Sequence, residues 1–254
     1  MKKFSDFWLK RPNETILDFV DNYDYEQFGK SIEASVQKYR DQYDGLKNEV
    51  HQLNEKIISI EKEIGDCYSE EILTLIHESV YIQEKINNYT YLDTLFEMKI
   101  INLFRSVELN IKSLIRYAYP NVEVKSFYRW DMMQSFFKSK NIDLTSIVHY
   151  DECNDLRNLN NCIKHSRKIT KRVQEIQEFK GTTQSIEFEQ LEKFYKRIIS
   201  KIPLFVQALK EEIKNDLYEF SDERLGRIVR DYYERMDEET YERFSLRIKK
   251  ADSI

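Results

Sequence analysis

Between Ile32 and Ile64, apolar side chains recur in an unbroken alternation of four-residue and three-residue steps. The ten positions are Ile32, Val36, Tyr39, Tyr43, Leu46, Val50, Leu53, Ile57, Ile60 and Ile64. This spacing draws a single apolar seam along about five heptads of helix, whereas a half-buried strand alternates at every second residue. The segment is therefore predicted to form one long amphipathic helix.

Two interpretations of this helix remain open from the sequence. Its seam can pair with a second copy or with another protein, as in a coiled coil. Alternatively, the helix lies on its own domain and completes the core in cis. A protein partner bound through residues 32–64 is accordingly one expectation.

The rest of the chain also favours helices. Its 254 residues include only five Gly and three Pro, and 33% of them are charged, which is typical of long helices rather than of many strands and turns. Apolar spacing predicts helices at about 70–87, 91–118, 127–138, 150–166 and 189–217, with two more after residue 221. The helix at 91–118 is expected at the centre of the core, and Pro203 is expected to kink the helix at 189–217. We predict an all-α fold with an arm at 1–66, a bundle at 67–217 and an extension at 218–254.

Charge and cysteine content narrow the functional classes. The chain has 40 basic and 45 acidic residues, a net charge of −5, so any nucleic-acid surface has to be local. No signal peptide or membrane-length apolar stretch is apparent, and Cys67, Cys153 and Cys162 lack metal-site spacing. We expect a cytoplasmic protein without membrane contact, metal or cofactor, in which Cys153 and Cys162 are buried.

The helix predicted at 150–166 concentrates the chemistry of the chain. At about 100° per residue, one face carries the guanidinium of Arg157, the amide of Asn161 and the imidazole of His165, with Lys164 beside them. The opposite face is apolar and consists of Leu156, Leu159 and Ile163. Such polar groups hold a phosphate and transfer a proton near neutral pH.

A basic run follows this stripe. Residues 164–172 contain five cations and no acid, namely Lys164, Arg167, Lys168, Lys171 and Arg172. The run is suited to an RNA backbone. It also has a structural explanation, because cations near a helix C-terminus stabilise the helix by about 0.3–1 kcal/mol.

The order of these features resembles the HEPN domain family. A long apolar helix and a helix containing Trp130 precede Tyr150-Asp151-Glu152-x-x-Asp155-Leu156-Arg157-Asn158-x-x-Asn161-x-x-Lys164-His165-Ser166. The resemblance covers roughly residues 70–217 and implies a HEPN-like helical bundle. The family pattern places four to six residues between its Arg and its His, whereas seven separate Arg157 from His165 here.

Active HEPN proteins are homodimers that cleave RNA without a metal, and many act as toxins or in phage defence. By this resemblance, His165 is a general acid or base, Arg157 stabilises charge on the phosphorus and Asn161 orients either group. The resemblance also implies RNA contacts for Asn158 and for the basic run, and products with 2′,3′-cyclic phosphate ends.

Other interpretations compete with this hypothesis. The same stripe can serve a non-catalytic module that binds RNA, a nucleotide or a protein. Arg157 can instead pair with Asp151 or Glu152 while His165 ends its helix, and Trp130 is expected in the core rather than under a base. A purely structural coiled-coil adaptor fits residues 32–64 but leaves Asn160, Asn161 and His165 unexplained.

Overall fold

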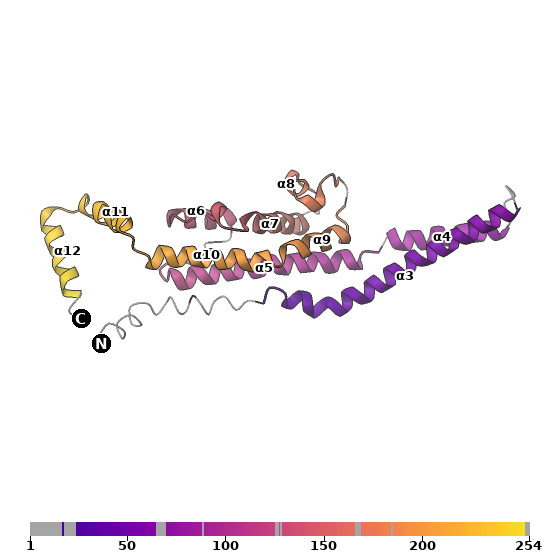
Figure 1. Cartoon of the computed structure of the whole chain (residues 1–254), viewed down its shortest axis with the longest axis horizontal. Coiled ribbons are helices and arrows are strands. Elements are labelled where there is room, and N and C mark those ends of the chain that lie inside the picture. The colour runs from indigo at the N-terminus through magenta and orange to yellow at the C-terminus, as the bar shows by residue number, and fades with distance from the viewer. Residues whose placement is uncertain are drawn as a thin grey trace.

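The computed structural model describes residue 17 and residues 24–64, 70–87, 89–124, 127, 129–165, 169–183 and 185–251. All regular elements within these residues are helical, which confirms the all-α prediction. With the labels of Figure 1, they are α3 (Gln27–Ile64), α4 (Glu70–Asn87), α5 (Tyr91–Ala118), α6 (Trp130–Ser139), α7 (Tyr150–His165), α8 (Lys171–Gln174), α9 (Phe188–Ile198), α10 (Lys201–Tyr218), α11 (Asp222–Tyr233) and α12 (Glu238–Ala251). Short 3-10 turns occur at Leu144–Ser146 and Gln177–Phe179.

The predicted helix at 189–217 is two helices rather than one kinked helix. The chain turns at Ile199 and Ser200, between α9 and α10. Pro203 is the third residue of α10, where the backbone N–H that proline lacks has no intrahelical acceptor. Proline is therefore tolerated at the start of a new helix, and the kink prediction was wrong.

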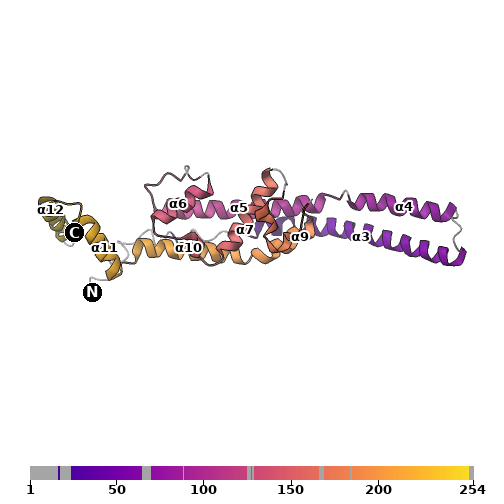
Figure 2. The ribbon, with the colours of Figure 1, turned by 90° about the horizontal axis from the view of Figure 1, so that it is seen from above.

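Helix α5 is the centre of the molecule, as predicted. It contacts α3, α7, α9 and α10, and its side chains Ile100, Val107, Ile111, Leu114 and Ile115 are fully buried. Figures 1 and 2 show α5 and α10 running side by side, with α6, α7 and α8 on one side of this pair and the first part of α3 on the other. The core thus lies where these layers meet.

Helices α3 and α4 form an antiparallel arm that projects beyond the bundle (Figure 1). The apolar seam of α3 changes partner along its length. Val36 belongs to the main core, whereas Leu53 joins Ile82 and Ile86 of α4 in a separate small cluster. The seam is therefore satisfied in cis by α5 and α4, and its pairing with a second chain stays a prediction.

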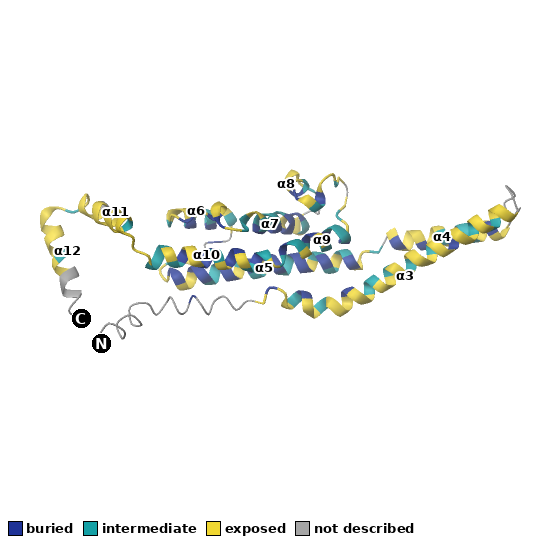
Figure 3. Ribbon diagram, in the orientation of Figure 1, coloured by how far each residue is buried: buried dark blue, intermediate teal, exposed yellow. Residues whose placement is uncertain are grey.

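The distal arm and the last two helices are the most exposed parts of the described chain (Figure 3). Val80 and Tyr81 on α4 are more than half exposed, as are Val229 and Tyr233 on α11. Within the described residues, none of the helices combines the length and apolar character needed to cross a membrane. The boundaries at 66 and 217 stay predictions, although α4 packs against α3 of the arm.

Candidate functional site

Helix α7 is amphipathic as its sequence predicts. Leu156 and Leu159 are fully buried, and Ile163 is half-buried against the core. Cys153 and Cys162 are also buried, and burial raises the pKa of Cys153 to about 12. Both thiols therefore pack as small apolar side chains, as expected.

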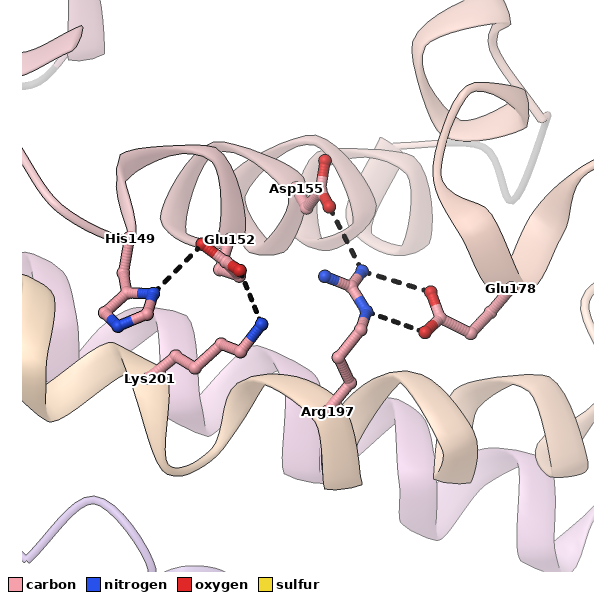
Figure 4. A network of polar contacts seen from close by, with 6 residues as sticks. All are labelled: His149, Glu152, Asp155, Glu178, Arg197 and Lys201. Carbon is pink, nitrogen blue, oxygen red and sulfur yellow. Dashed lines mark hydrogen bonds and ion pairs between the residues drawn. The ribbon is translucent and has the colours of Figure 1, made fainter. Parts of the chain in front are cut away.

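The first turn of α7 is tied to α10 by an ion pair. The Nζ of Lys201 donates to Glu152 at 2.7 Å, and Nδ1 of His149 lies 3.4 Å from the other carboxylate oxygen (Figure 4). Burial acts to raise the pKa of Glu152, but Lys201, a backbone hydrogen bond and His149 together outweigh burial and lower it. Glu152 is thereby engaged with the bundle and not with Arg157.

The next turn of α7 is held by Arg197 of α9. The guanidinium of Arg197 binds Asp155 at 3.1 Å and both carboxylate oxygens of Glu178, at 2.7 and 3.1 Å (Figure 4). Burial raises the pKa of Asp155 and outweighs the opposing effect of Arg197. These contacts fix how far α7 is rotated about its own axis, because an apolar face alone permits some rotation.

The outward side of α7 faces a hollow of about 750 Å³ lined by residues of α5, α6, α7 and α8 and of the segment before α6. Six of the residues selected from the sequence line this hollow. They are Arg157, Asn158, Asn161, Lys164, His165 and Arg172. The three nominated catalytic residues and half of the nominated RNA-binding residues are thus brought to one surface.

The other residues of the basic run do not all line the hollow. Lys171 is exposed and does not line the hollow, whereas its neighbour Arg172 does. Arg167 and Lys168 lie outside the described residues. Helix α8 presents Arg172 because Thr170 caps its first turn, with the Thr170 side chain accepting from the Val173 N–H, and because Val173 is buried.

Arg157 is fixed by neutral groups. Its Nε and Nη2 donate to Oδ1 of Asn154 at 3.2 and 2.8 Å, and Nη2 also donates to Oδ1 of Asn158 at 3.2 Å. The ring of Trp130 lies 5.7 Å from its Cζ, within cation–π distance. No carboxylate among the described residues pairs with Arg157, so the alternative of an ion pair with Asp151 or Glu152 is wrong.

Burial lowers the pKa of Arg157, with Arg172 adding to the effect and Tyr150 opposing it. An arginine nevertheless stays protonated in proteins. The guanidinium is therefore half-buried, oriented and charged, without a counter-ion among the described residues. Such a group binds a phosphate strongly because it neither reorients nor gives up another ion pair.

The hollow as a whole has an excess of positive charge. Its two acidic residues already have basic partners, since Asp131 pairs with Arg129 and Glu108 lies 2.5 Å from Lys112. Arg157, Lys164 and Arg172 have no acidic partner in the part of the chain that the structure describes. The surface is consequently suited to an anion despite the acidic net charge of the chain.

Several lining residues were missed in the sequence. Tyr150 and Asn154 extend the stripe of α7 towards its N-terminus at spacings of three and four residues, so the same periodicity could have found them. Gln134 of α6, whose amide donates to the Tyr150 hydroxyl at 2.8 Å, carries no comparable signal. Trp130 packs partly against the core as predicted, but it also lines the hollow.

Two polar atoms of lining residues are buried without a partner in the described structure. Asn160 is 1% exposed and its Oδ1 accepts no hydrogen bond, although its Nδ2 lies 3.5 Å from Oδ1 of Asn161. The indole Nε1 of Trp130 likewise donates to no group. Buried polar groups usually have a hydrogen-bond partner, so these two atoms can bind water or a polar group.

Among the described residues, no group of three or more His, Cys, Asp or Glu side chains is arranged to hold a metal ion. Comparison of the chain with family models, curated proteins and solved structures finds no match. Its function is therefore inferred from the chemistry of the hollow.

Proposed function

We propose that this protein is a metal-independent endoribonuclease of the HEPN type that acts as a homodimer in phage defence or in a toxin system. The observation that carries the proposal is the shared surface of Arg157, Asn161 and His165 in a hollow with uncompensated positive charge. The all-α bundle, with α7 packed on a long central helix, is compatible with the sequence resemblance on which the proposal rests.

In the proposed reaction, the imidazole of His165 takes the proton of a ribose 2′-hydroxyl. The 2′-oxygen then attacks the adjacent phosphorus and the bond to the 5′-oxygen breaks. The leaving 5′-oxygen takes a proton from the imidazolium that His165 has become, and a 2′,3′-cyclic phosphate and a 5′-hydroxyl result. Arg157 stabilises the charge that builds on the phosphoryl oxygens, because an oriented donor is most effective where charge develops.

The spacing of the two residues bears on the dimer. Eight helical steps separate Arg157 from His165, which is about 12 Å along the axis of α7. Within one protomer the two groups therefore lie two helical turns apart in the hollow. A second copy that brought its own α7 alongside would supply an additional Arg157 and His165, as the resemblance implies.

The first test is incubation of the purified protein with mixed tRNA and a structured RNA in EDTA. The wild-type protein is expected to release fragments with 2′,3′-cyclic phosphate ends, and Arg157→Ala and His165→Ala are each expected to abolish cleavage. Arg172→Ala should reduce cleavage, whereas Lys171→Ala, its neighbour outside the hollow, serves as the matched control.

Circular dichroism and light scattering establish that each variant keeps its helicity and assembly. Cleavage that persists in both Arg157→Ala and His165→Ala would contradict the proposal. So would cleavage by the wild-type protein that stops in EDTA and returns with added magnesium.

A second candidate is a non-catalytic module that holds RNA in the same hollow. The observation in its favour is the separation of Arg157 from His165 by about 12 Å along α7. The group that would stabilise charge and the group that would transfer a proton then lie two helical turns apart. A binder retards RNA in a gel without shortening it, and its retention weakens as salt displaces the phosphate contacts. Intact but retarded RNA in the first test would select this candidate.

A further inference from the structure

The hollow differs in chemistry from one part to another. Along α7 it extends from Tyr150 to His165, about 22 Å at the rise of a helix. Lys164, His165 and Arg172 line the end near the C-terminus of α7. The lining from α5, α6 and the segment before α6 includes the aromatic and apolar side chains Phe104, Phe127, Trp130 and Met133, beside the polar Glu108, Arg129, Asp131 and Gln134.

Arg157 lies where these two parts meet, with its guanidinium over the indole of Trp130. The site thus offers flat aromatic and guanidinium surfaces next to phosphate-binding groups. Unstacked RNA bases are held in this way, by stacking on aromatic rings or on arginine planes while the backbone is bound by cations. A volume of about 750 Å³ lies within the range of sites for small ligands.

Trp130 belongs to the aromatic part of the hollow, whereas Asn160 lies three residues past Arg157 along α7, towards the cationic end. Trp130 Nε1 is a donor and Asn160 Oδ1 is an acceptor, and both residues line the hollow. The edge of a nucleobase presents acceptors and donors together, so a base in the hollow can bond to polar groups of the lining. A phosphate or a sugar alone offers no flat surface to the indole.

We infer that the aromatic part of the hollow is a nucleobase subsite, which holds one unstacked base of the RNA on Trp130 while Arg157 binds the phosphate next to it. This inference deepens the proposed function and rests on it for the identity of the ligand as RNA. Its consequence is that binding and cleavage depend on an unpaired base and not on the backbone alone.

The test measures binding and needs no cleavage. The chain contains two tryptophans, so a Trp8→Phe protein carries Trp130 as its single indole reporter. Uridine 3′-monophosphate and adenosine 3′-monophosphate are titrated into this protein beside ribose 5-phosphate and inorganic phosphate. Saturable quenching of Trp130 by the nucleotides, with little effect of the two base-free probes, is the expected result.

Calorimetric titration of the Trp130 variants gives a second measure. Trp130→Leu should weaken nucleotide binding roughly 5- to 150-fold, the range that stacking of one base corresponds to, and weaken phosphate binding much less. Trp130→Phe keeps an aromatic face and should retain most of the affinity, which also separates loss of stacking from loss of folding. Equal affinity for nucleotides and ribose 5-phosphate, or equal behaviour of the Leu and Phe variants, would overturn the subsite.

A 2′-O-methyl trinucleotide, which cannot undergo the proposed cleavage, separates RNA from free nucleotides as the source of the base. It should bind at least tenfold more tightly than the mononucleotides, because it also reaches Lys164 and Arg172. Equal affinity would overturn RNA as the ligand. A protein that cleaves RNA without quenching refutes only the subsite, whereas one that shows quenching and never cleaves refutes only the nuclease.

Discussion

At the scale of single residues, the choice of amides rather than carboxylates around Arg157 is the most informative feature of the hollow. Asn154 and Asn158 orient the guanidinium through their carbonyl oxygens and leave its charge unneutralised. A carboxylate in the same place would orient it equally well, but an incoming phosphate would then compete with an existing ion pair. The two roles, orientation and charge, can therefore be separated by mutation.

Substitution of Asn154 separates them. Asn154→Ala removes two hydrogen bonds to Arg157 and keeps its charge, so we expect RNA affinity to fall about two- to tenfold, equivalent to roughly 0.5–1.5 kcal/mol. Asn154→Asp keeps the hydrogen bonds and adds a negative charge, and we expect the larger loss. Fluorescence anisotropy with labelled RNA at two salt concentrations measures both. If the Ala variant is the weaker binder, orientation and not free charge is the main contribution of Asn154.

The two acids that anchor α7 respond to folding in opposite directions. The pKa of Glu152 is lowered in the folded protein, so its ionised form stabilises the fold. The pKa of Asp155 is raised by burial, so folding disfavours its ionised form even beside Arg197. Arg197 is less dependent on Asp155, because Glu178 binds the same guanidinium at two positions.

Glu152→Gln should accordingly lower the free energy of unfolding by about 1–3 kcal/mol at pH 7, the usual contribution of a hydrogen bond to a charged group. The contribution of Glu152 is complete above its unfolded pKa and is lost as the pH falls through its lower folded pKa. The difference between wild type and variant should therefore shrink below about pH 4.5. Urea unfolding at several pH values measures it, with Asp155→Asn as the control expected to lose less at pH 7. A difference that stays constant down to pH 3 would contradict this assignment.

At the scale of helices, the antiparallel arm formed by α3 and α4 has a small apolar core. Among the described residues, the cluster that joins α3 to α4 buries Leu53, Ile82 and Ile86, and Ile72 of α4 is also buried. Beyond Leu53, the seam residues Ile57 and Ile60 of α3 are half-buried. The distal arm therefore has a small stabilising core and should open more readily than the bundle.

Two positions on α4 make a matched pair for this prediction. Ile82 is 4% exposed, whereas Val80, two residues away, is 54% exposed. Ile82→Ala should destabilise the arm by about 2–3 kcal/mol, at the low end for a buried aliphatic residue because solvent is near, and Val80→Ala should change stability by less than about 0.5 kcal/mol. Hydrogen exchange of arm amides, compared with those of α5, is the measurement. Equal effects of the two substitutions would show that the arm is not held by this cluster in solution.

Sequence periodicity predicted α4 and α5 to the residue because each is a single run with a clear apolar stripe and a break at both ends. It failed at α9 and α10, where the apolar spacing continues across the turn at Ile199 and Ser200. The seam of α3 was also visible, but periodicity reports only that a face is buried and not which helix buries it. The structure shows that α4 packs back along α3 and that α5 covers the first part of the seam.

The candidate site was likewise predicted from the sequence only in part. The stripe on α7 could be predicted because all its members share one helix. Its partners Trp130, Gln134 and Arg172 come from α6 and α8, and their convergence follows from how the layers stack. The hydrogen bonds that Arg157 donates to Asn154 and Asn158 lie within the same helix, yet ion pairs with nearby acids were an alternative. Lys201 binds Glu152 and Arg197 binds Asp155, so these two acids are engaged by residues outside α7 and not by Arg157.

At the scale of the whole molecule, α5 is the element that the arm and the hollow have in common. It contacts α3 on one side and α7 on the other, and residues of α5 line the hollow. A structural change in the first part of α3 can therefore be transmitted to the hollow through the packing of α5. The distal arm and helices α11 and α12 lie outside this route (Figures 1 and 2).

The distal end of the arm, where α3 ends and α4 begins, lies far from α6, α7 and α8 and projects past the end of the bundle (Figure 1). A protein that gripped only this distal end would leave the opening over α7 unobstructed. Its influence on turnover would therefore be noncompetitive, with the apparent affinity for RNA preserved. An inhibitor seated over α6 and α8 would instead compete with RNA, so the form of inhibition alone would reveal which end of the molecule a regulator holds.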